Sequence, residues 1–388
     1  MSPRTAVTAA RLLSDVEQLL LDAGDIDTLP ADVHTDVLTR LGKTGALGAL
    51  VPAEYGGGAL SYLAYGELSR TVAEKSASLQ SVLTVHGMVC RALTRWGAAP
   101  LRTEFLPDLA AGTTVGAFAL SEEEAGSDVR RVATTARRDG DSWVLSGHKK
   151  WITFGAVAEV FLVFAVHEGR DLAVLVRRQD PGVEILPAPA MSGFRGARLA
   201  ELRLRECRVP ADRLLGRQGA ALSHIATDAL TLGRLCVAYG AYGLAREATE
   251  AALACSIDRQ QFGGPLHRLQ LVRGLLSDAV VATEAAGLMC ERAARALDDP
   301  DDRTMSHVLT AKLSASRAAT TAAQVAAQLH GAAGLVADSP VDRYVRDARV
   351  LEVIEGNTQL LQHLVAEQAL ARHRVRRAER DARARART

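Results

Sequence analysis

Apolar residues recur at three- and four-residue steps through the first part of the chain, a period typical of amphipathic helices. The clearest such segments are residues 9–23, 31–44, 60–72 and 78–96. Pro52 and the glycines at 56–58 form a break between two of these segments. The pattern predicts an N-terminal α-helical domain over residues 1–112.

The pattern changes to short apolar runs near residue 113, with glycine and proline between them. Asp139-Gly140 lies in the middle of residues 133–147, where two β-prone segments flank it in the way typical of a hairpin. Further short runs favour strands at residues 113–120, 159–166, 171–176, 183–186 and 199–207. We therefore predict a middle β domain of barrel or sandwich type over residues 113–212.

The helical period returns after residue 212 and continues almost to the end of the chain. Four segments are long enough to form a bundle: residues 220–256, 269–296, 304–330 and 359–371. We predict a C-terminal four-helix bundle over residues 213–372, so that the fold class is α+β multidomain. The arginine-rich tail, residues 373–388, is typical of a solvated or frayed end.

Composition excludes several classes of protein. The chain of 388 residues is 48% hydrophobic with a net charge of +1, so no global field attracts nucleic acid or an anionic membrane. No stretch of 18 uncharged apolar residues is present, and the N-terminal residues lack the apolar core of a signal peptide. The five cysteines are scattered without metal-ligand spacing, as in a reducing compartment. We expect a cytoplasmic protein that binds neither nucleic acid nor membranes, and no metal.

Glu355 is the first candidate for chemistry. It follows the apolar run at residues 350–354 and precedes Gly356, and then Asn357 and Thr358, which are favourable N-cap residues for a helix. A carboxylate among buried apolar residues has a raised pKa and can accept a proton from a weak carbon acid. An ordinary loop glutamate would fit the same pattern, so this segment alone does not decide between the two.

Two segments of the β domain are candidates for binding a ligand. SEEEAGSD follows the strand that ends near Leu120, and strand ends with small hydroxyl residues often present N–H and O–H groups to ligands. Trp151 and Thr153 lie two apart on an expected strand and would share one face, which suits a flat aromatic ligand. An acidic surface turn and a plain core edge are the simpler alternatives. The chain has neither a dinucleotide-binding glycine motif nor a phosphate-binding loop with lysine.

Four motifs in order give the chain its resemblance to a known family. FALSEEEAGSD, GHKKWIT, DRQQFGGP and VDRYVRDARVLEVIEGNTQLLQ resemble the signature segments of the acyl-CoA dehydrogenases, and the resemblance covers nearly the whole chain. It implies FAD as the cofactor, an acyl thioester as the substrate, and an electron-accepting flavoprotein or oxygen as the final acceptor. It also implies a homodimer or homotetramer.

The resemblance also implies roles for particular residues. Glu355 is the expected catalytic base, which removes a proton while a hydride leaves for the flavin. The residues expected to bind FAD are Leu120, Ser121, Ser127, Trp151, Thr153, Arg259, Phe262, Gln328, Gly331, Asn357, Thr358 and Gln359. Arg259, Phe262, Gln328 and Gly331 would act on the cofactor of a neighbouring subunit. The residues expected near the substrate are Ser127, Arg234 and Gly356.

The chain departs from the family pattern at four positions. Ser121 replaces a threonine, Glu123 a proline and His330 an aromatic residue. Thr231 stands three residues before Arg234, where many members carry an aspartate that helps to hold CoA, so ordinary CoA recognition is in doubt.

Finer features resemble one branch of the family. SLQSVLTVHGM, the FGAVAEVFLVF that follows GHKKWIT, and EVIEG resemble dehydrogenases of actinobacterial polyketide and nonribosomal pathways that act on carrier-protein-bound acyl groups. One such type oxidises a hydroxyacyl thioester on the way to methoxymalonyl extender units. The alternatives are a flavin-dependent oxidase or monooxygenase of the same fold, and a non-catalytic, flavin-binding, DNA-associated protein. The glutamate at position 355 argues against the monooxygenases, which generally lack it.

Overall fold

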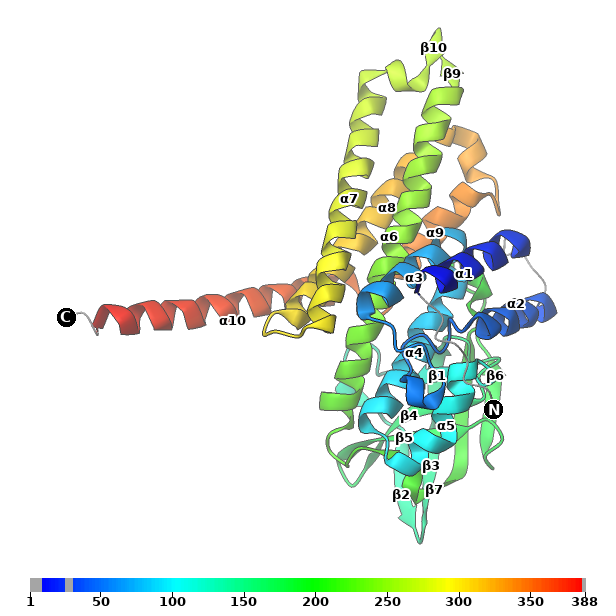
Figure 1. The fold of residues 1–388 in the computed structure, drawn as a ribbon, viewed down its shortest axis with the longest axis vertical. Coiled ribbons are helices and arrows are strands. Elements are labelled where there is room, and N and C mark those ends of the chain that lie inside the picture. Colours follow the sequence, from blue (N-terminus) through cyan, green and yellow to red (C-terminus); the bar gives the residue numbers. More distant parts are fainter. Residues whose placement is uncertain (1–8, 25–30, 386–388) are drawn as a thin grey trace.

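The computed structural model describes residues 9–24 and 31–385. Its N-terminal part is helical, as predicted (Figure 1), and contains α1 (Ala9–Ala23), α2 (Ala31–Thr44), α3 (Tyr62–Lys75), α4 (Ala77–Trp96) and α5 (Ala99–Ala111). Serine caps begin two of these helices. The Ser61 side chain accepts from the N–H of Ala64, and the Ser76 side chain accepts from that of Leu79. The chain before residue 9, which the signal-peptide expectation covers in part, lies outside the described residues.

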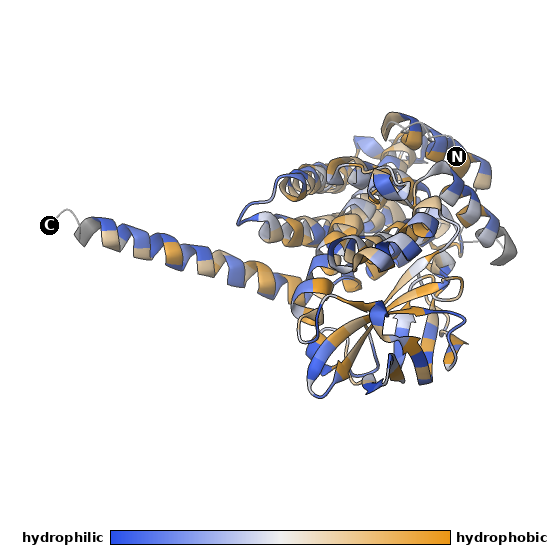
Figure 2. Ribbon diagram, turned by 60° about the horizontal axis from the view of Figure 1, so that its bottom comes forward, coloured by the Kyte–Doolittle hydropathy of each residue, from blue (hydrophilic) through white to orange (hydrophobic). Residues whose placement is uncertain are grey.

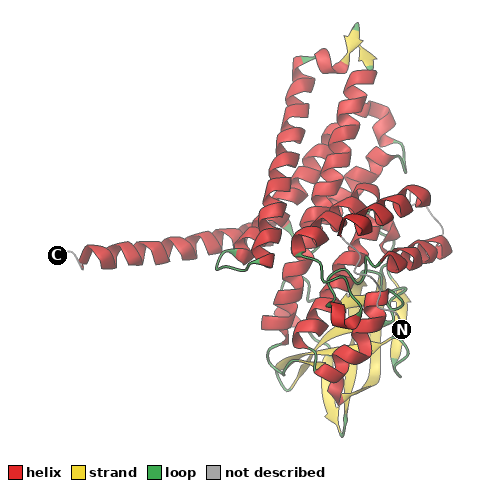
Figure 3. Ribbon diagram, viewed as in Figure 1, coloured by secondary structure: helices red, strands yellow, loops and turns green. Residues whose placement is uncertain are grey.

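The middle of the chain forms one eight-stranded sheet (Figure 3). Its order is β6-β7-β3-β2-β4-β5-β8, and β1 pairs in parallel with β4. The strands are β1 (Gly116–Ala119), β2 (Thr135–Asp139), β3 (Ser142–Ile152), β4 (Val160–His167), β5 (Arg170–Arg177), β6 (Val183–Pro187), β7 (Ala200–Pro210) and β8 (Leu214–Leu215). The hairpin predicted at Asp139-Gly140 is confirmed, and β8 is a strand that the sequence pattern did not indicate.

Helix α4 joins the sheet to the helices. His86 lies in its middle, with Nδ1 3.1 Å from the backbone nitrogen of Gly116 and Nε2 3.2 Å from the carbonyl oxygen of Leu109. Burial lowers the pKa of His86 to about 4, so the ring is neutral and Nδ1 can accept the N–H of Gly116. Arg91 pairs with both carboxylate oxygens of Asp228, at 2.9 and 2.8 Å, and so fixes α4 to the C-terminal helices.

The C-terminal helices are α6 (Thr227–Asp258), α7 (Gln270–Asp298), α8 (Thr304–His330), α9 (Pro340–Val353) and α10 (Thr358–Arg385). A π-helical turn, Ala221–Ala226, leads into α6, and β9 (Gln260–Gln261) and β10 (Gly264–Pro265) form a small hairpin at the far tip.

The expected bundle needs one correction. The fourth packed helix is α9, which the sequence pattern did not separate from its surroundings, whereas the predicted last helix, α10, projects sideways from the body (Figure 1). Of the two alternatives predicted for the tail, solvated or frayed, its described residues are solvated and not frayed, because α10 continues as a helix to Arg385. Its outer half is exposed and rich in arginine, and Figure 2 shows it as mostly hydrophilic. Residues 386–388 of the tail lie outside the described residues.

Candidate active site

Glu355 lies in the short turn between α9 and α10, as the sequence predicts. Its φ angle is 54°, in the left-handed region that a glutamate rarely adopts. The residue keeps some accessible surface, but its Oε2 atom is buried and has no hydrogen-bond partner among the described residues. Burial raises the pKa of Glu355 to about 7, although the charges of Arg234 and Lys312 oppose the rise. A buried carboxylate without donors is a ready proton acceptor.

Gly233 makes room for this carboxylate. A Cβ atom at that position of α6 would lie 2.6 Å from Oε2 of Glu355 and 2.8 Å from the sulfur of Met88 on α4. Real Cβ atoms essentially never show such short contacts, so any larger residue at position 233 would force the side chain of Glu355 or Met88 to shift. Glycine inside a helix costs about 1 kcal/mol relative to alanine, a cost that a close approach of this kind explains.

Two cations hold the backbone of the same turn. The Arg234 side chain donates from Nε to the carbonyl oxygen of Glu355 at 3.1 Å, and Lys312 donates to that of Gly356 at 2.7 Å. Burial lowers the pKa of Arg234 from its ordinary value. The expected substrate residue Arg234 therefore contacts the turn that carries Glu355, and Gly356 is part of the same turn, which Lys312 also binds.

The turn also contacts the loop after β1. The Asn357 side chain donates to Oγ of Ser127 at 3.0 Å and accepts the N–H of Leu360 at 2.9 Å, so it caps α10 as expected. Its neighbour Thr358 has a buried Oγ1 without a hydrogen-bond partner in the described part of the chain. Gln359 is exposed beside it. The structure thus brings together residues from the first and the last of the four motifs.

The loop after β1 is held by a buried ion pair that sequence reasoning missed. Glu122 accepts from Nζ of Lys149 at 2.7 Å and from the hydroxyl of Thr134 at 2.6 Å. Lys149 also donates to the carbonyl oxygen of Leu120 at 3.2 Å, while the carbonyl of Ser121 accepts the N–H of residue 150. Burial lowers the pKa of Lys149 to about 8, but for Glu122 the bonds and charge of the lysine outweigh burial and lower the pKa. The pair is ionised at neutral pH and fixes the loop.

Trp151 and Thr153 do not share a strand face in the way the pattern predicts. β3 ends at Ile152, and the pairing with β7 is irregular between Lys149 and Ile152. Trp151 has a φ of 60° and is 45% exposed, whereas Thr153 lies in the following turn and is half-buried. The exposed indole on a strained backbone is an unusual arrangement and suits a stacking surface for a flat ligand.

The remaining expected residues form a second group at the far end of the bundle. Arg259 donates to the carbonyl oxygen of Leu329 at 3.0 Å and to that of His330, and Gly331 lies against its guanidinium. Gln328 is exposed nearby, and Phe262, at the tip of the small hairpin, is 91% exposed. Lys312 and Leu329 are 17 residues apart on α8, which corresponds to about 25 Å along the helix. These residues cannot reach the Glu355 site of the same chain.

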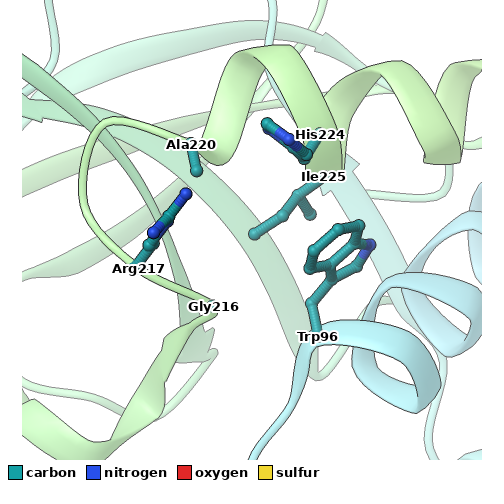
Figure 4. A pocket seen from close by; sticks show the side chains of 6 residues that line it. All are labelled: Trp96, Gly216, Arg217, Ala220, His224 and Ile225. Carbon is teal, nitrogen blue, oxygen red and sulfur yellow. The ribbon is translucent and has the colours of Figure 1, made fainter.

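A separate cavity of about 350 Å³ lies where the π-helical turn meets the end of α4 (Figure 4). It is lined by Trp96, Gly216, Arg217, Ala220, His224 and Ile225. None of the expected site residues lines it, and Trp96 and His224 pack edge to face there. Its lining includes one possible base, the imidazole of His224, but no residue of the four motifs.

Gly233 and Lys312 are site residues that the sequence reading did not single out for a role. The signal for Gly233 is a glycine in the middle of a long helical segment, directly before Arg234. The signal for Lys312 is a single lysine among alanine, leucine and serine on α8, at a position where the helix is buried. Both roles depend on contacts between residues far apart in the chain.

The order of helical, sheet and helical domains, with a buried carboxylate at their junction, defines an oxidoreductase scaffold of known type. Family models for the N-terminal, middle and C-terminal domains of acyl-CoA dehydrogenase match residues 16–113, 117–207 and 223–370. The chain belongs to the acyl-CoA dehydrogenase family and is therefore an FAD-dependent oxidoreductase.

Individual relatives cover most of the chain. It is 35% identical to the human mitochondrial short-chain specific acyl-CoA dehydrogenase, over 88% of this chain and 84% of that one. It is 34% identical to the probable acyl-CoA dehydrogenase FadE25 of Mycobacterium tuberculosis, over 94% of each. Among solved structures, FkbI for biosynthesis of the methoxymalonyl extender unit of Fk520 is 36% identical, with a TM-score of 0.81 over 94% of this chain and 98% of that one.

The residues present fit FAD. Trp151 offers a half-exposed indole. Thr358, at the N-terminus of α10, offers a buried hydroxyl that has no hydrogen-bond partner among residues 9–24 and 31–385, and free N–H groups at such a terminus favour a phosphate or another anion. Both lie on segments that the Asn357–Ser127 contact and the Glu122–Lys149 pair hold in place.

Proposed function

We propose that this chain oxidises a short acyl group carried as a thioester, with Glu355 as the base that takes the substrate proton. The single observation that carries the proposal is the Glu355 carboxylate, whose Oε2 is buried without a donor among the described residues and whose pKa is raised by burial to about 7. A base with this pKa is about half ionised at neutral pH and is still strong enough to accept a proton.

The turn that carries Glu355 supplies both a proton acceptor and a hydrogen-bond donor. Glu355 takes a proton either from the α-carbon of an acyl thioester or from the hydroxyl of a hydroxyacyl group. The amide N–H of Glu355 donates to no acceptor within the described residues, so it is available to the thioester carbonyl, where negative charge develops. When bound, FAD supplies the two-electron acceptor for the hydride that leaves the substrate carbon. An electron-transfer flavoprotein or oxygen would then reoxidise it.

The substrate we favour is carried by a carrier protein rather than by CoA. Thr231 donates its hydroxyl to the carbonyl oxygen of Thr227 at 2.7 Å and contacts the sulfur of Met305 at 3.8 Å, so it offers CoA no carboxylate. The similarity to FkbI, a protein of methoxymalonyl extender unit biosynthesis, supports oxidation of a hydroxyacyl group in polyketide biosynthesis. The alternative is an ordinary short-chain acyl-CoA substrate, as in the human relative.

Anaerobic bleaching of the flavin absorbance tests the substrate. The purified protein is mixed with short acyl and hydroxyacyl groups, presented either on CoA or on a phosphopantetheinylated carrier protein. Bleaching only by carrier-bound groups is the expected result. Bleaching by simple acyl-CoA at equal concentration would refute carrier selectivity, and no bleaching by either would favour an oxidase or monooxygenase reaction.

The protein is proposed to be a homodimer or homotetramer. Its second group of expected cofactor residues, around Arg259 and Phe262, lies about 25 Å along α8 from the Glu355 turn, and a neighbouring copy would bring it to a cofactor. The outer face of α7 supports this assembly, because it exposes apolar side chains at helical spacing: Leu271, Leu275, Val281 and Leu288. A shallow groove between α7 and α8, lined in part by Met289 and Leu313, adjoins that face.

Light scattering of two matched variants tests the interface. Leu288 on α7 and Leu21 on α1 are 69% and 65% exposed, so a glutamate at either position is equally accessible in a monomer. We expect Leu288→Glu to lower the molar mass in solution and to release FAD, and Leu21→Glu to do neither. Unchanged mass for both variants would place the interface elsewhere.

Among residues 9–24 and 31–385, no helix is both long and apolar enough to cross a membrane.

A further inference from the structure

Lys312 is a buried cation that the mechanism above does not use. Its side chain is fully buried in α8, and Nζ lies 2.7 Å from the carbonyl oxygen of Gly356 and 3.5 Å from that of Glu352. Within the described residues no ion pair of Lys312 at 4.0 Å or less is found, although the charge of Glu355 acts on it from farther away. Burial lowers the pKa of Lys312 to about 8. A buried charge without a paired counter-ion is costly, so its position calls for a function.

Arg234 approaches the same turn from another helix. Its Nε is 3.1 Å from the carbonyl oxygen of Glu355, so α6 and α8 each supply one cation to the end of α9. The carbonyls they bind, at residues 352, 355 and 356, include groups at the C-terminal end of α9, where the helix dipole favours positive charge. The left-handed backbone of Glu355 is thereby fixed from both sides.

Apart from Arg234 and Lys312, the groups that face the Glu355 carboxylate are uncharged. Arg234 and Lys312 are the two charges that lower its pKa, from α6 and α8 respectively. From α6 the thiol of Cys236 also faces it, and its own pKa is raised to about 12, chiefly by burial, so it stays neutral. From α4 the uncharged sulfur of Met88 approaches the same place, because it lies 2.8 Å from the point where a Cβ at Gly233 would be and Oε2 of Glu355 lies 2.6 Å from that point. The balance of charge at the base therefore depends on the two cations.

We propose that Lys312, together with Arg234, is a positioning residue for the reaction: it fixes the turn that carries Glu355 and supplies positive charge that favours the carboxylate form of the base. This inference rests on the proposed role of Glu355. Because a peptide unit is planar, fixing the carbonyl of Glu355 also fixes the N–H of Gly356 on the opposite side of the same plane. The cations therefore set both the orientation and the charge of the site.

The pH dependence of flavin reduction in a single turnover tests the proposal. In Lys312→Met the midpoint of the rise in rate should move upwards by on the order of 1 pH unit, because a nearby positive charge is lost. Lys312→Arg, which keeps the charge, should leave the midpoint at the wild-type value. A purely structural role would lower stability or rate in Lys312→Met without moving the midpoint, and that result would overturn the proposal.

A second variant keeps the test decisive if Lys312→Met does not fold. Arg234→Gln removes the other cation at a half-buried position, and the midpoint should again move upwards. An unmoved midpoint in folded Arg234→Gln overturns the proposal too. Glu355→Gln separates the two hypotheses. If Glu355→Gln reduces its flavin at the wild-type rate, the proposed function fails. If Glu355→Gln is inactive but the midpoint in Lys312→Met does not move, only the role of the cations is refuted.

Discussion

Replacing Glu355 by glutamine should stabilise the protein in a pH-dependent way. The two side chains have nearly the same size and shape, so the change removes the charge and little else. In the native protein the buried Oε2 has no donor among the described residues, and burial raises the pKa of Glu355 to about 7 from an ordinary 4.5. The folded state therefore favours the neutral acid, and ionisation of this group opposes folding.

The size of the effect follows from the two pKa values. Below pH 4.5 the glutamate is neutral in both states, and the substitution should change the unfolding free energy little. As the pH rises from 4.5 to 7, the unfolded chain loses its proton first and the wild type loses up to about 3 kcal/mol of stability. The glutamine variant escapes this loss. For 388 residues, with an unfolding entropy of about 2 cal/mol/K per residue, its Tm at pH 8 should be about 4 °C higher.

Scanning calorimetry at pH 5 and pH 8 measures the difference. Glu352→Gln serves as the control, because Glu352 lies three residues earlier on α9 and pairs with Arg349 at 2.7 Å near the surface. We expect Glu355→Gln to raise Tm at pH 8 much more than at pH 5, while the control changes Tm equally at both. The same Glu355 variant should slow flavin reduction by at least about 100-fold, because an amide cannot accept the proton. Equal changes in Tm at both pH values would refute the buried, unpaired carboxylate on which the mechanism depends.

Three further outcomes test the site. Gly233→Ala should slow flavin reduction at least tenfold while FAD stays bound, since its new Cβ would lie 2.6 Å from Oε2 of Glu355; absorbance spectra and stopped-flow rates check this, and an unchanged rate would contradict the close packing. Lys149→Met should cost about 3–5 kcal/mol in urea unfolding and weaken FAD retention, because it leaves the buried Glu122 unpaired; a variant as stable as wild type would contradict the structural role of the pair. In the wild type, flavin reduction should rise with pH through about 7, in step with ionisation of the Glu355 carboxyl, and a flat profile between pH 6 and 8 would contradict that assignment.

Local sequence signals predicted the parts of the fold that depend on local chemistry. Periodicity gave the bounds of α1 and α8 to the residue, and Asp139-Gly140 gave the β2–β3 hairpin. Helix α9 was missed because charged residues interrupt its apolar pattern between two stronger segments. The prediction that Trp151 and Thr153 share a strand face was wrong, because irregular pairing and a positive φ reorient the end of β3. No residue pattern indicates this change.

In the candidate site, too, the sequence predicted the residue with a local signal and missed those whose role depends on tertiary contacts. Glu355 was found because its own neighbours in sequence are apolar and a helix begins directly after it. Gly233 and Lys312 were missed as site residues because the turn that they approach, at Glu355 and Gly356, lies more than 40 residues away in the chain. Arg234 was recognised, but its contact with the backbone of Glu355 follows only from the packing of α6 against α9.

The projecting helix α10 gives the molecule an uneven distribution of charge. Residues 370–388 contain eight arginines and two acidic residues, a net charge of +6, so with +1 for the whole chain the remaining residues carry −5. The described part of this segment, here called the arm, extends away from the body (Figure 1). The positive charges of the arm are therefore separated in space from the net negative charge of the body. At low ionic strength the arm of one molecule should attract the body of another, whereas at about 0.15 M salt the range of this attraction shrinks to about 8 Å. Handling the protein in dilute buffer therefore favours association that has nothing to do with its native assembly, and mass measurements belong at physiological salt or above.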